Sequence, residues 1–409
     1  MARKNTEQPK QRLLLNAEAF GFGPTAAIAD CFPFLRKHFS TIGFVGTGHT
    51  LDLQRPLAYD AIHDLSLLDS GACQSTTDRP VETPAETPAE TNVDQELNEI
   101  FAQYDIFLTA LDFAMAEKAL RQGLTVCIYD PLTWYWKTIP AVVSEVDLYI
   151  AQNFFGVEER LNSAEFAAAK WQTVAPIVGH EPENTLKDLI LVNLGGLSNP
   201  LWSGNEALSY ARRILEAVLP TLAGQKVVVA ANSAISSALA HLGAKNLSRE
   251  QMQVVLQQAK YALMTPGLGN IYDAARFNTP TIWLPPANDS QGQQLALLNK
   301  SGLVDGLVDW HQILPIRAID YSADQGAVLK SVAAAVEQAQ GSKKAKIALT
   351  KLLRRQIKAL PQTSRLTALV EQFGSGGAQH VAELVYQQSY QQSCRQANHQ
   401  ANKKEVQNV

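Results

Sequence analysis

The sequence predicts an α/β protein made of two Rossmann-like domains with parallel sheets, which face each other across a central cleft. The chain has 409 residues, which is long for a single hydrophobic core. Strand-like and helix-like segments alternate over residues 12–178 and again from residue 188 onward. Such alternation is typical of parallel strands covered by helices. Ligands of these sheets bind beyond the carboxyl ends of the strands, so we expect the site there.

In the first domain, residues 12–178, apolar runs that often stop at Gly or Asp predict strands, and amphipathic runs between them predict helices. The expected strands are 12–20, 41–48, 104–112, 124–132 and 147–155. The expected helices are 26–39, with Pro33 as a kink or break, and 94–103, 113–123, 139–146 and 156–170. The stretch 69–94 contains ETPAETPAET and almost no large apolar residues, which predicts a disordered surface insertion.

The second domain, residues 188–340, repeats the pattern. Strands are expected at 188–196, 225–233, 260–269 and 280–286, and helices at 205–219, 248–259, 270–278 and 290–302. Ser248 is the expected N-cap of its helix. Helical patterns at 328–340, 344–360 and 379–388 predict a group of C-terminal helices over 341–388. The polar segments 1–11 and 389–409 are expected to be flexible.

The overall composition excludes several classes of function. A formal charge of −4 and a pI near 6.1 argue against general nucleic-acid binding. No apolar run reaches the roughly 18 residues that span a bilayer, and the polar N-terminus does not resemble a secretory signal. The four cysteines have no metal or disulfide spacing. We therefore expect a cytoplasmic protein with reduced thiols.

Two glycine turns in the second domain are candidate phosphate sites. Gly195 and Gly196 follow its first strand, where backbone N–H groups could approach a diphosphate. Taken alone, such glycines more often only make turns. The second turn contains Gly267 and Gly269 in TPGLGN, directly before an expected helix.

That helix carries Asn270 and Asp273, and the next strand leads into a loop rich in amides. An acid in this position can accept hydrogen bonds from ribose hydroxyls, or it can simply favour the helix dipole. Amides both donate and accept hydrogen bonds, so they suit sugar hydroxyls, although a solvated loop with Ser290 as an N-cap fits equally. The candidate donor-sugar residues are Gln291, Gln293 and Gln294, beside Asn288 and Asp289.

The first domain supplies candidates for catalysis and acceptor binding at its strand ends. A sugar transfer with inversion needs a base, and a histidine has an ordinary pKa near 6.5 that suits this role. A turn or surface histidine and an ordinary Asp-Pro turn remain alternatives. The candidate catalytic residues are His49, Asp130 and Glu18, and the candidate acceptor residues are Gly23, Asp112, Trp134 and Trp136. The aromatic run could instead be core, or touch a membrane surface.

The stretch LMTPGLGNIYDAARFNTPTIWLPPANDSQGQQ resembles the nucleotide-sugar motif of GT-B glycosyltransferases. It is most similar to the bacterial transferase that adds N-acetylglucosamine to the lipid-linked cell-wall precursor. The resemblance implies that Asp273 holds the ribose and that Gln293 and Gln294 contact the donor sugar. Gln291 stands where that family often has an acid.

The same resemblance assigns the glycine loop after the first strand of the second domain to Gly195 and Gly196, and base contacts to Asn232 and Ser233. This sequence departs from the family in the first loop, NAEAFGFGPTAAI, where the family often has a histidine and this chain has none. GFGPTAA and DPLTWYW are also similar to cytosylglucuronic acid synthases, which implies a flat, heterocyclic acceptor.

The resemblance implies inverting transfer of a sugar from UDP to a small acceptor, without a metal or further cofactor. Two alternatives stay open, a UDP-sugar 2-epimerase and a non-catalytic protein that binds nucleotide sugars. A homodimer and contact with a membrane surface are also open. The basic residues near Lys343–Lys358 could contact anionic lipid or another subunit, and a solvated helix face is the alternative.

Overall fold

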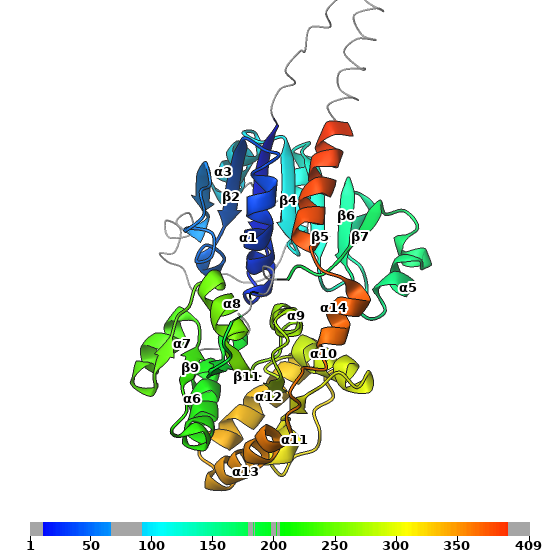
Figure 1. Cartoon of the computed structure of the whole chain (residues 1–409). Coiled ribbons are helices and arrows are strands. Elements are labelled where there is room, and N and C mark those ends of the chain that lie inside the picture. The colour runs from blue at the N-terminus through cyan, green and yellow to red at the C-terminus, as the bar shows by residue number, and fades with distance from the viewer. Residues whose placement is uncertain are drawn as a thin grey trace, which may run out of the picture.

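The computed structural model describes residues 11–66, 92–178, 183, 185–197, 202 and 205–391. Two α/β domains lie end to end, with helices on both faces of each sheet (Figure 1). This is the predicted fold class. The predictions for residues 1–10, for most of the insertion, and for residues 392–409 lie outside the described residues.

The first sheet has seven strands in the order β3-β2-β1-β4-β5-β6-β7, and every neighbouring pair is parallel. Each central strand is apolar on both faces, as a sheet covered by helices requires. The strands are β1 Arg12–Ala17, β2 Thr41–Gly46, β3 Ala61–Asp64, β4 Ile106–Ala110, β5 Thr125–Asp130, β6 Leu148–Gln152 and β7 Trp171–Val174. The helices are α1 Gly23–Leu35, α3 Asn92–Phe101, α4 Phe113–Arg121 and α5 Val157–Leu161.

The second sheet has six parallel strands in the order β10-β9-β8-β11-β12-β13. They are β8 Leu189–Asn193, β9 Val227–Ala230, β10 Ala244–Lys245, β11 Ala259–Met264, β12 Thr281–Trp283 and β13 Gly306–Leu307. The helices are α6 Glu206–Val218, α7 Ser233–Ala238, α8 Arg249–Gln257, α9 Leu268–Arg276, α10 Asp289–Lys300, α11 Trp310–Ile313, α12 Gln325–Gln340, α13 Lys343–Ala359 and α14 Thr367–Phe373.

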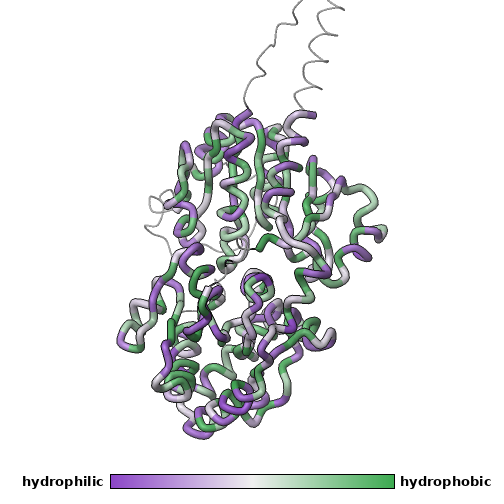
Figure 2. Tube along the Cα trace, in the orientation of Figure 1, coloured by the Kyte–Doolittle hydropathy of each residue, from purple (hydrophilic) through white to green (hydrophobic). Residues whose placement is uncertain are grey.

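Hydrophobic residues concentrate along the strands and the inner helix faces, and hydrophilic residues along loops and outer faces (Figure 2). One buried cluster continues from the first domain into the second, because Phe154, which follows β6, contacts Tyr272 of α9 and Phe373 of α14. The domains are therefore joined by packed side chains as well as by the chain itself.

The last described helix, residues 377–391, returns to the first domain and lies beside its sheet (Figure 1). Val381 and Val385 are fully buried in the same cluster as Leu13 and Leu15 of β1. The predicted C-terminal helices over 341–388 are thus divided between the two domains. α12 and α13 pack on α6 of the second domain, whereas residues 377–391 pack on the first.

Several local predictions also differ from the structure. Short edge strands β3, β7, β10 and β13 were missed, because two to four residues give no clear periodicity. The helix expected at 139–146 is only a 3₁₀ turn at Ala141–Ser144. α3 begins at Asn92, so residues 92–94 are helical and not part of an insertion, and the C-terminal helix extends through residue 391.

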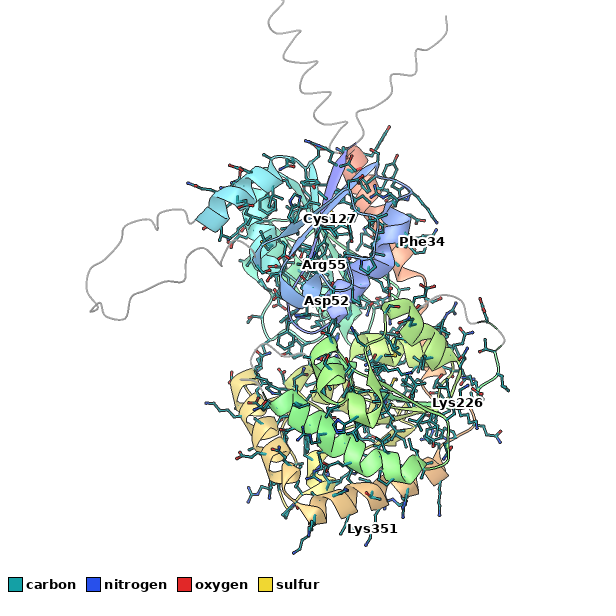
Figure 3. All side chains as sticks on the ribbon, turned by 90° about the vertical axis from the view of Figure 1, so that its left-hand side faces the viewer. Phe34, Asp52, Arg55, Cys127, Lys226 and Lys351 are labelled. Atoms are coloured by element: carbon teal, nitrogen blue, oxygen red, sulfur yellow. The ribbon has the colours of Figure 1, made fainter. Side chains whose placement is uncertain are left out.

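The exposed face of α13 is basic, and its Lys351 projects from the end of the second domain that is farthest from the first (Figure 3). Six cations on this helix are exposed, namely Lys343, Lys344, Lys351, Arg354, Arg355 and Lys358. The helix carries no acid, although the whole chain has a net charge of −4. Within the described ranges, every helix is too short or too polar to cross a lipid bilayer.

Candidate functional site

The carboxyl-terminal ends of strands from both sheets lie at the junction of the two domains, where side chains of one domain bond to the other (Figure 1). Tyr135, which follows β5, donates to Asp289 at the start of α10. Tyr272 of α9 donates to the Asn153 carbonyl at 3.0 Å. This is the place where ligands bind to such sheets, so we built the candidate site there.

The structure brings the predicted Glu18 and Asp112 together at the ends of β1 and β4. Burial raises the pKa of Glu18, and the nearby Asp112 charge raises it further. Burial also raises the pKa of Asp112, whose carboxylate caps α4 by accepting from the Met115 N–H at 3.0 Å. Burial and the charge of Asp112 therefore both disfavour the charged form of Glu18.

His49 lies in the turn after β2 and contacts the loop after β1. Its Nε2 is 2.7 Å from the Gly21 carbonyl oxygen, and its ring meets Phe22 edge-on at 5.1 Å. A carbonyl can only accept, so Nε2 carries the hydrogen, and Nδ1 is the ring nitrogen that can act as an acceptor. Gly23 begins α1 in the same loop, with open space where a Cβ would lie. The structure therefore places His49, Gly23 and Glu18 around one loop.

Asp130 does not fit the predicted catalytic role. It is fully buried at the end of β5 and accepts from Tyr149 Oη at 2.5 Å, Trp136 Nε1 at 2.7 Å and the Leu132 N–H at 2.5 Å. Burial raises its pKa to about 6 against these hydrogen bonds, which lower it. Asp130 accepts three internal hydrogen bonds and has no exposed surface, so it holds the loop that follows β5 in place.

The loop 131–136 carries the predicted aromatic residues, but they do not form an open stacking surface. Trp134 donates from Nε1 to the Pro131 carbonyl at 3.2 Å and lies tilted against Phe154. Trp136 is held by Asp130. Both indoles are half-buried and hold the loop itself, and the acceptor-binding role of Trp134 and Trp136 stays a prediction.

The aromatic side chain between them, Tyr135, points to the second domain. Its hydroxyl donates to Oδ2 of Asp289, which is 2% exposed. The other carboxylate oxygen, Oδ1, is buried, and no described residue donates to it. Gln294, five residues further along α10, has a buried Oε1 that likewise lacks a donor among the described residues. Buried acceptors without donors are costly, and a ligand hydroxyl is one way to satisfy them.

The glycine loop after β8 does not offer the bare amides that the sequence suggested. The Gly195 N–H donates to Asn193 Oδ1 at 2.8 Å, and the Gly196 N–H donates to Thr265 Oγ1 at 3.2 Å. The Gly196 carbonyl accepts from Gln291 Nε2 at 2.9 Å. A Cβ on Gly196 would lie 3.0 Å from Thr265 Oγ1 and 3.2 Å from the Pro266 carbonyl oxygen, so the backbone is closely packed here.

The second glycine turn keeps its N–H groups available. Gly267 is the N-cap of α9 and has no capping side chain. No described residue accepts from the N–H groups of Leu268 or Gly269 in the first turn. Asn270 instead holds the turn, because its Nδ2 donates to the Thr265 carbonyl at 3.1 Å. An uncapped helix N-terminus of this kind is suited to an anion.

Asp273 is ion-paired and not open to a ribose. Its carboxylate is 1% exposed and receives both guanidinium nitrogens of Arg249, with Nη2 at 3.1 Å from Oδ1. Arg249 also reaches Asp30 of α1 in the first domain, at 3.0 Å. The two acids raise the pKa of Arg249, while burial raises that of Asp30. Asp273, which was predicted to bind the ribose, is thus part of an ion pair that links the domains.

The remaining predicted donor residues are divided between internal contacts and open groups. Gln291 is 4% exposed and holds two loops, through Gly196 and the Ala287 N–H. Gln293 donates to the Tyr321 carbonyl at 2.8 Å. Asn232 caps α7, and the Ser233 carbonyl accepts from two serines of that helix. Of the predicted amides, Gln294 is the one with a buried acceptor that lacks a donor among the described residues.

Sequence reasoning did not single out Tyr135, Asp289 or Arg249 as site residues. Tyr135 stood between the two tryptophans, and Asp289 stood beside the predicted glutamines, so their neighbourhood was identified but not their roles. Arg249 follows the predicted cap Ser248 and gave no signal of its own, because its partners lie 24 and 219 residues away. Within the described ranges, no group of three or more His, Cys, Asp or Glu residues is arranged to hold a metal.

Comparisons with known proteins establish the fold. No protein-family model and no curated protein matches the chain. Among solved structures, UGT73P12 of Glycyrrhiza uralensis, complexed with glycyrrhetinic acid 3-O-monoglucuronide, has a TM-score of 0.52 at 8% identity, covering 98% of this chain and 100% of its own. UGT89C1 of Arabidopsis thaliana, complexed with UDP-L-rhamnose, has 0.46 at 12%, covering 93% and 100%. The calicheamicin glycosyltransferase CalG4 has 0.45 at 13%, covering 93% and 98%.

Two facing parallel-sheet domains with a C-terminal helix that returns to the first domain define the GT-B class of fold. This particular chain has that fold over nearly its full length. The narrower resemblance to the lipid-linked N-acetylglucosaminyltransferase stays a prediction.

Proposed function

We propose that the chain is a glycosyltransferase that moves a sugar from a UDP-sugar to a small acceptor. The observation that carries the proposal is the pair of buried acceptor oxygens on α10, Asp289 Oδ1 and Gln294 Oε1, for which the described residues supply no donor. A sugar offers several hydroxyl donors at close spacing. The GT-B fold and the open N-terminus of α9 support the same assignment.

The diphosphate would bind at the N-terminus of α9. The first-turn N–H groups of Leu268 and Gly269 point along the helix axis, and the helix dipole adds a partial positive charge there. As the bond between sugar and diphosphate breaks, negative charge grows on the leaving diphosphate. Backbone donors held in place before the reaction stabilise that charge without reorganising.

The acceptor would approach from the first domain, and His49 is the proposed base. Its Nε2 is fixed as the donor to Gly21, so Nδ1 is the nitrogen that can take the acceptor proton. Proton removal on one face of the sugar and departure of the diphosphate on the other make a single displacement with inversion. The UGT73P12 structure holds a glycosylated natural product, and we propose an acceptor of similar size.

The test is to measure binding and turnover with UDP, UDP-glucose, UDP-N-acetylglucosamine and UDP-glucuronic acid. Asp289→Asn should keep its affinity for UDP but lose about 10- to 100-fold of its affinity for the preferred UDP-sugar, because a hydrogen bond to a charged acceptor is lost. His49→Gln should bind that UDP-sugar like the wild type, with turnover lower by about 10²-fold or more. Calorimetry and product analysis give the two readouts separately.

Each alternative predicts a different result. A wild-type protein that binds no UDP-sugar would contradict the proposal. Conversion of the UDP-sugar to an isomer without any acceptor would identify an epimerase instead. Tight binding with no product from a broad panel of small phenols, alcohols and heterocycles would identify a non-catalytic protein.

A further inference from the structure

Several contacts within the first domain hold the loop 131–136, which carries Tyr135. The loop 131–136 is anchored at its start by buried Asp130 and along its length by Arg160, whose Nη1 donates to the Thr133 carbonyl at 2.9 Å and also to the Trp136 carbonyl. Thr133 Oγ1 is 2.9 Å from Tyr149 Oη, so the loop is tied to β6 as well. A loop held at this many points presents its remaining side chain in one orientation.

That remaining side chain is Tyr135. Trp134 and Trp136 both use their indole N–H within the loop, whereas the Tyr135 hydroxyl crosses to the second domain and donates to Asp289 Oδ2. The two tryptophan rings flank it, with ring centroids at 5.7 and 5.3 Å. The tyrosine is thereby fixed from both sides against the carboxylate.

The two carboxylate oxygens of Asp289 differ in their hydrogen-bond partners. Oδ2 has the Tyr135 hydroxyl, and Oδ1 has no donor among the described residues. A hydroxyl that donated to Oδ1 would lie between about 3 and about 7 Å from the tyrosine oxygen, depending on the lone pairs used, and the nearer positions bring both oxygens within reach of one sugar ring. The phenol oxygen donates once and can still accept.

From this geometry we propose that Tyr135 is a donor-sugar specificity residue, supplied by the acceptor-binding domain to the site on the other domain. This inference rests on the proposed function. One hydroxyl of the sugar donates to Asp289 Oδ1, and the neighbouring hydroxyl on the same ring donates to Tyr135 Oη. The site therefore selects UDP-hexoses with two free hydroxyls on adjacent carbons.

The protonation state of the tyrosine agrees with this role. Burial and the hydrogen bond to Asp289 raise the pKa of Tyr135, so the phenol stays neutral and keeps its donor hydrogen. Its position on the first domain also means that the full sugar site exists only when the two domains are in contact. A UDP molecule without a sugar would not use Tyr135.

The experiment compares the wild type with Tyr135→Phe, which removes the hydroxyl and keeps the ring. Affinities are measured for UDP, UDP-glucose and the 2-deoxy, 3-deoxy and 4-deoxy analogues of UDP-glucose. The wild type should prefer UDP-glucose over two analogues that lack hydroxyls on adjacent carbons. In Tyr135→Phe the preference over one analogue should fall by about 3- to 10-fold, as expected for one neutral hydrogen bond, while UDP affinity stays unchanged.

Tyr272→Phe is the matched control, because its hydroxyl also crosses between the domains but reaches the Asn153 carbonyl and not a carboxylate. It should keep wild-type discrimination among the sugars. Unchanged discrimination in Tyr135→Phe, or the same change in both variants, would overturn the inference and leave the proposed function intact. If the wild-type protein binds no UDP-sugar, both the inference and the proposed function are overturned.

Discussion

Asp130 of the first domain and Asp289 of the second are both buried carboxylates at the domain junction, yet their surroundings differ. Asp130 receives three internal hydrogen bonds, and Asp289 receives one, from the opposite domain. Both domains use most of their strand-end groups in internal contacts. The exceptions in the second domain are the uncapped N-terminus of α9 and two buried acceptors on α10, Asp289 Oδ1 and Gln294 Oε1, which lack a donor among the described residues. The count of internal partners therefore separates supporting groups from candidate ligand groups better than residue type does.

The largest expected effect lies where the two domains meet, at Arg249. Arg249→Met should lower the free energy of unfolding by about 3 kcal/mol, because Asp30 and Asp273 lose the cation that compensates their burial. Chemical denaturation at neutral pH measures the change.

Arg12→Met is the control for that variant. It removes a salt bridge with Asp105 in which both side chains are more than 40% exposed, and should cost at most about 1 kcal/mol. Equal losses in the two variants would show that the junction is no more sensitive than the surface.

Asp130 should make the stability of the protein against unfolding depend on pH. Its pKa is about 6 in the folded protein against an ordinary 3.8, so the folded state binds the proton more tightly than the unfolded state. Stability contributed by this group therefore rises as the pH falls through 6. Relative to Asp130→Asn, the wild type should gain about 2 kcal/mol between pH 7 and pH 4.5. Parallel stability curves for the two proteins would contradict the assignment.

Gly196 tests whether the contrast between the domains holds inside the second domain. We expect Gly196→Ala to destabilise the fold by about 1–3 kcal/mol, because its Cβ would crowd Thr265 and Pro266, with little effect on UDP affinity. Gly269→Ala has open space and should be neutral or slightly stabilising. A Gly196→Ala protein of normal stability that no longer binds UDP would show that the loop after β8 faces the ligand after all.

The fold was predictable because its signals are local. The apolar runs of β1, β4, β5, β8 and β11 are long enough to identify, and glycine or a capping residue marks many of the boundaries between elements. Ser248 is an example, since it caps α8 as expected, with Gln251 completing the capping box. The short edge strands and the return of residues 377–391 to the first domain were not predictable, because they depend on contacts between distant segments.

The sequence indicated the neighbourhood of the candidate site, and the roles of its residues stay predictions. The amide-rich start of α10 lies at the junction, where Asp289 bonds to Tyr135 of the first domain. What sequence could not show is which polar groups are already used. Asp273 is bonded to Arg249, and Asp130 is enclosed by Tyr149 and Trp136. Each of these pairings brings together residues of different elements, so composition and spacing carry no trace of them.

The path of the chain near its C-terminus limits how the molecule can open. It passes from the first domain to the second once after residue 178, and residues 360–376 carry it back. Two covalent crossings keep the domains tethered to each other when contacts at the junction open. We expect an opening of the junction to break the Tyr135–Asp289 and Arg249–Asp30 contacts together, because both join the two domains.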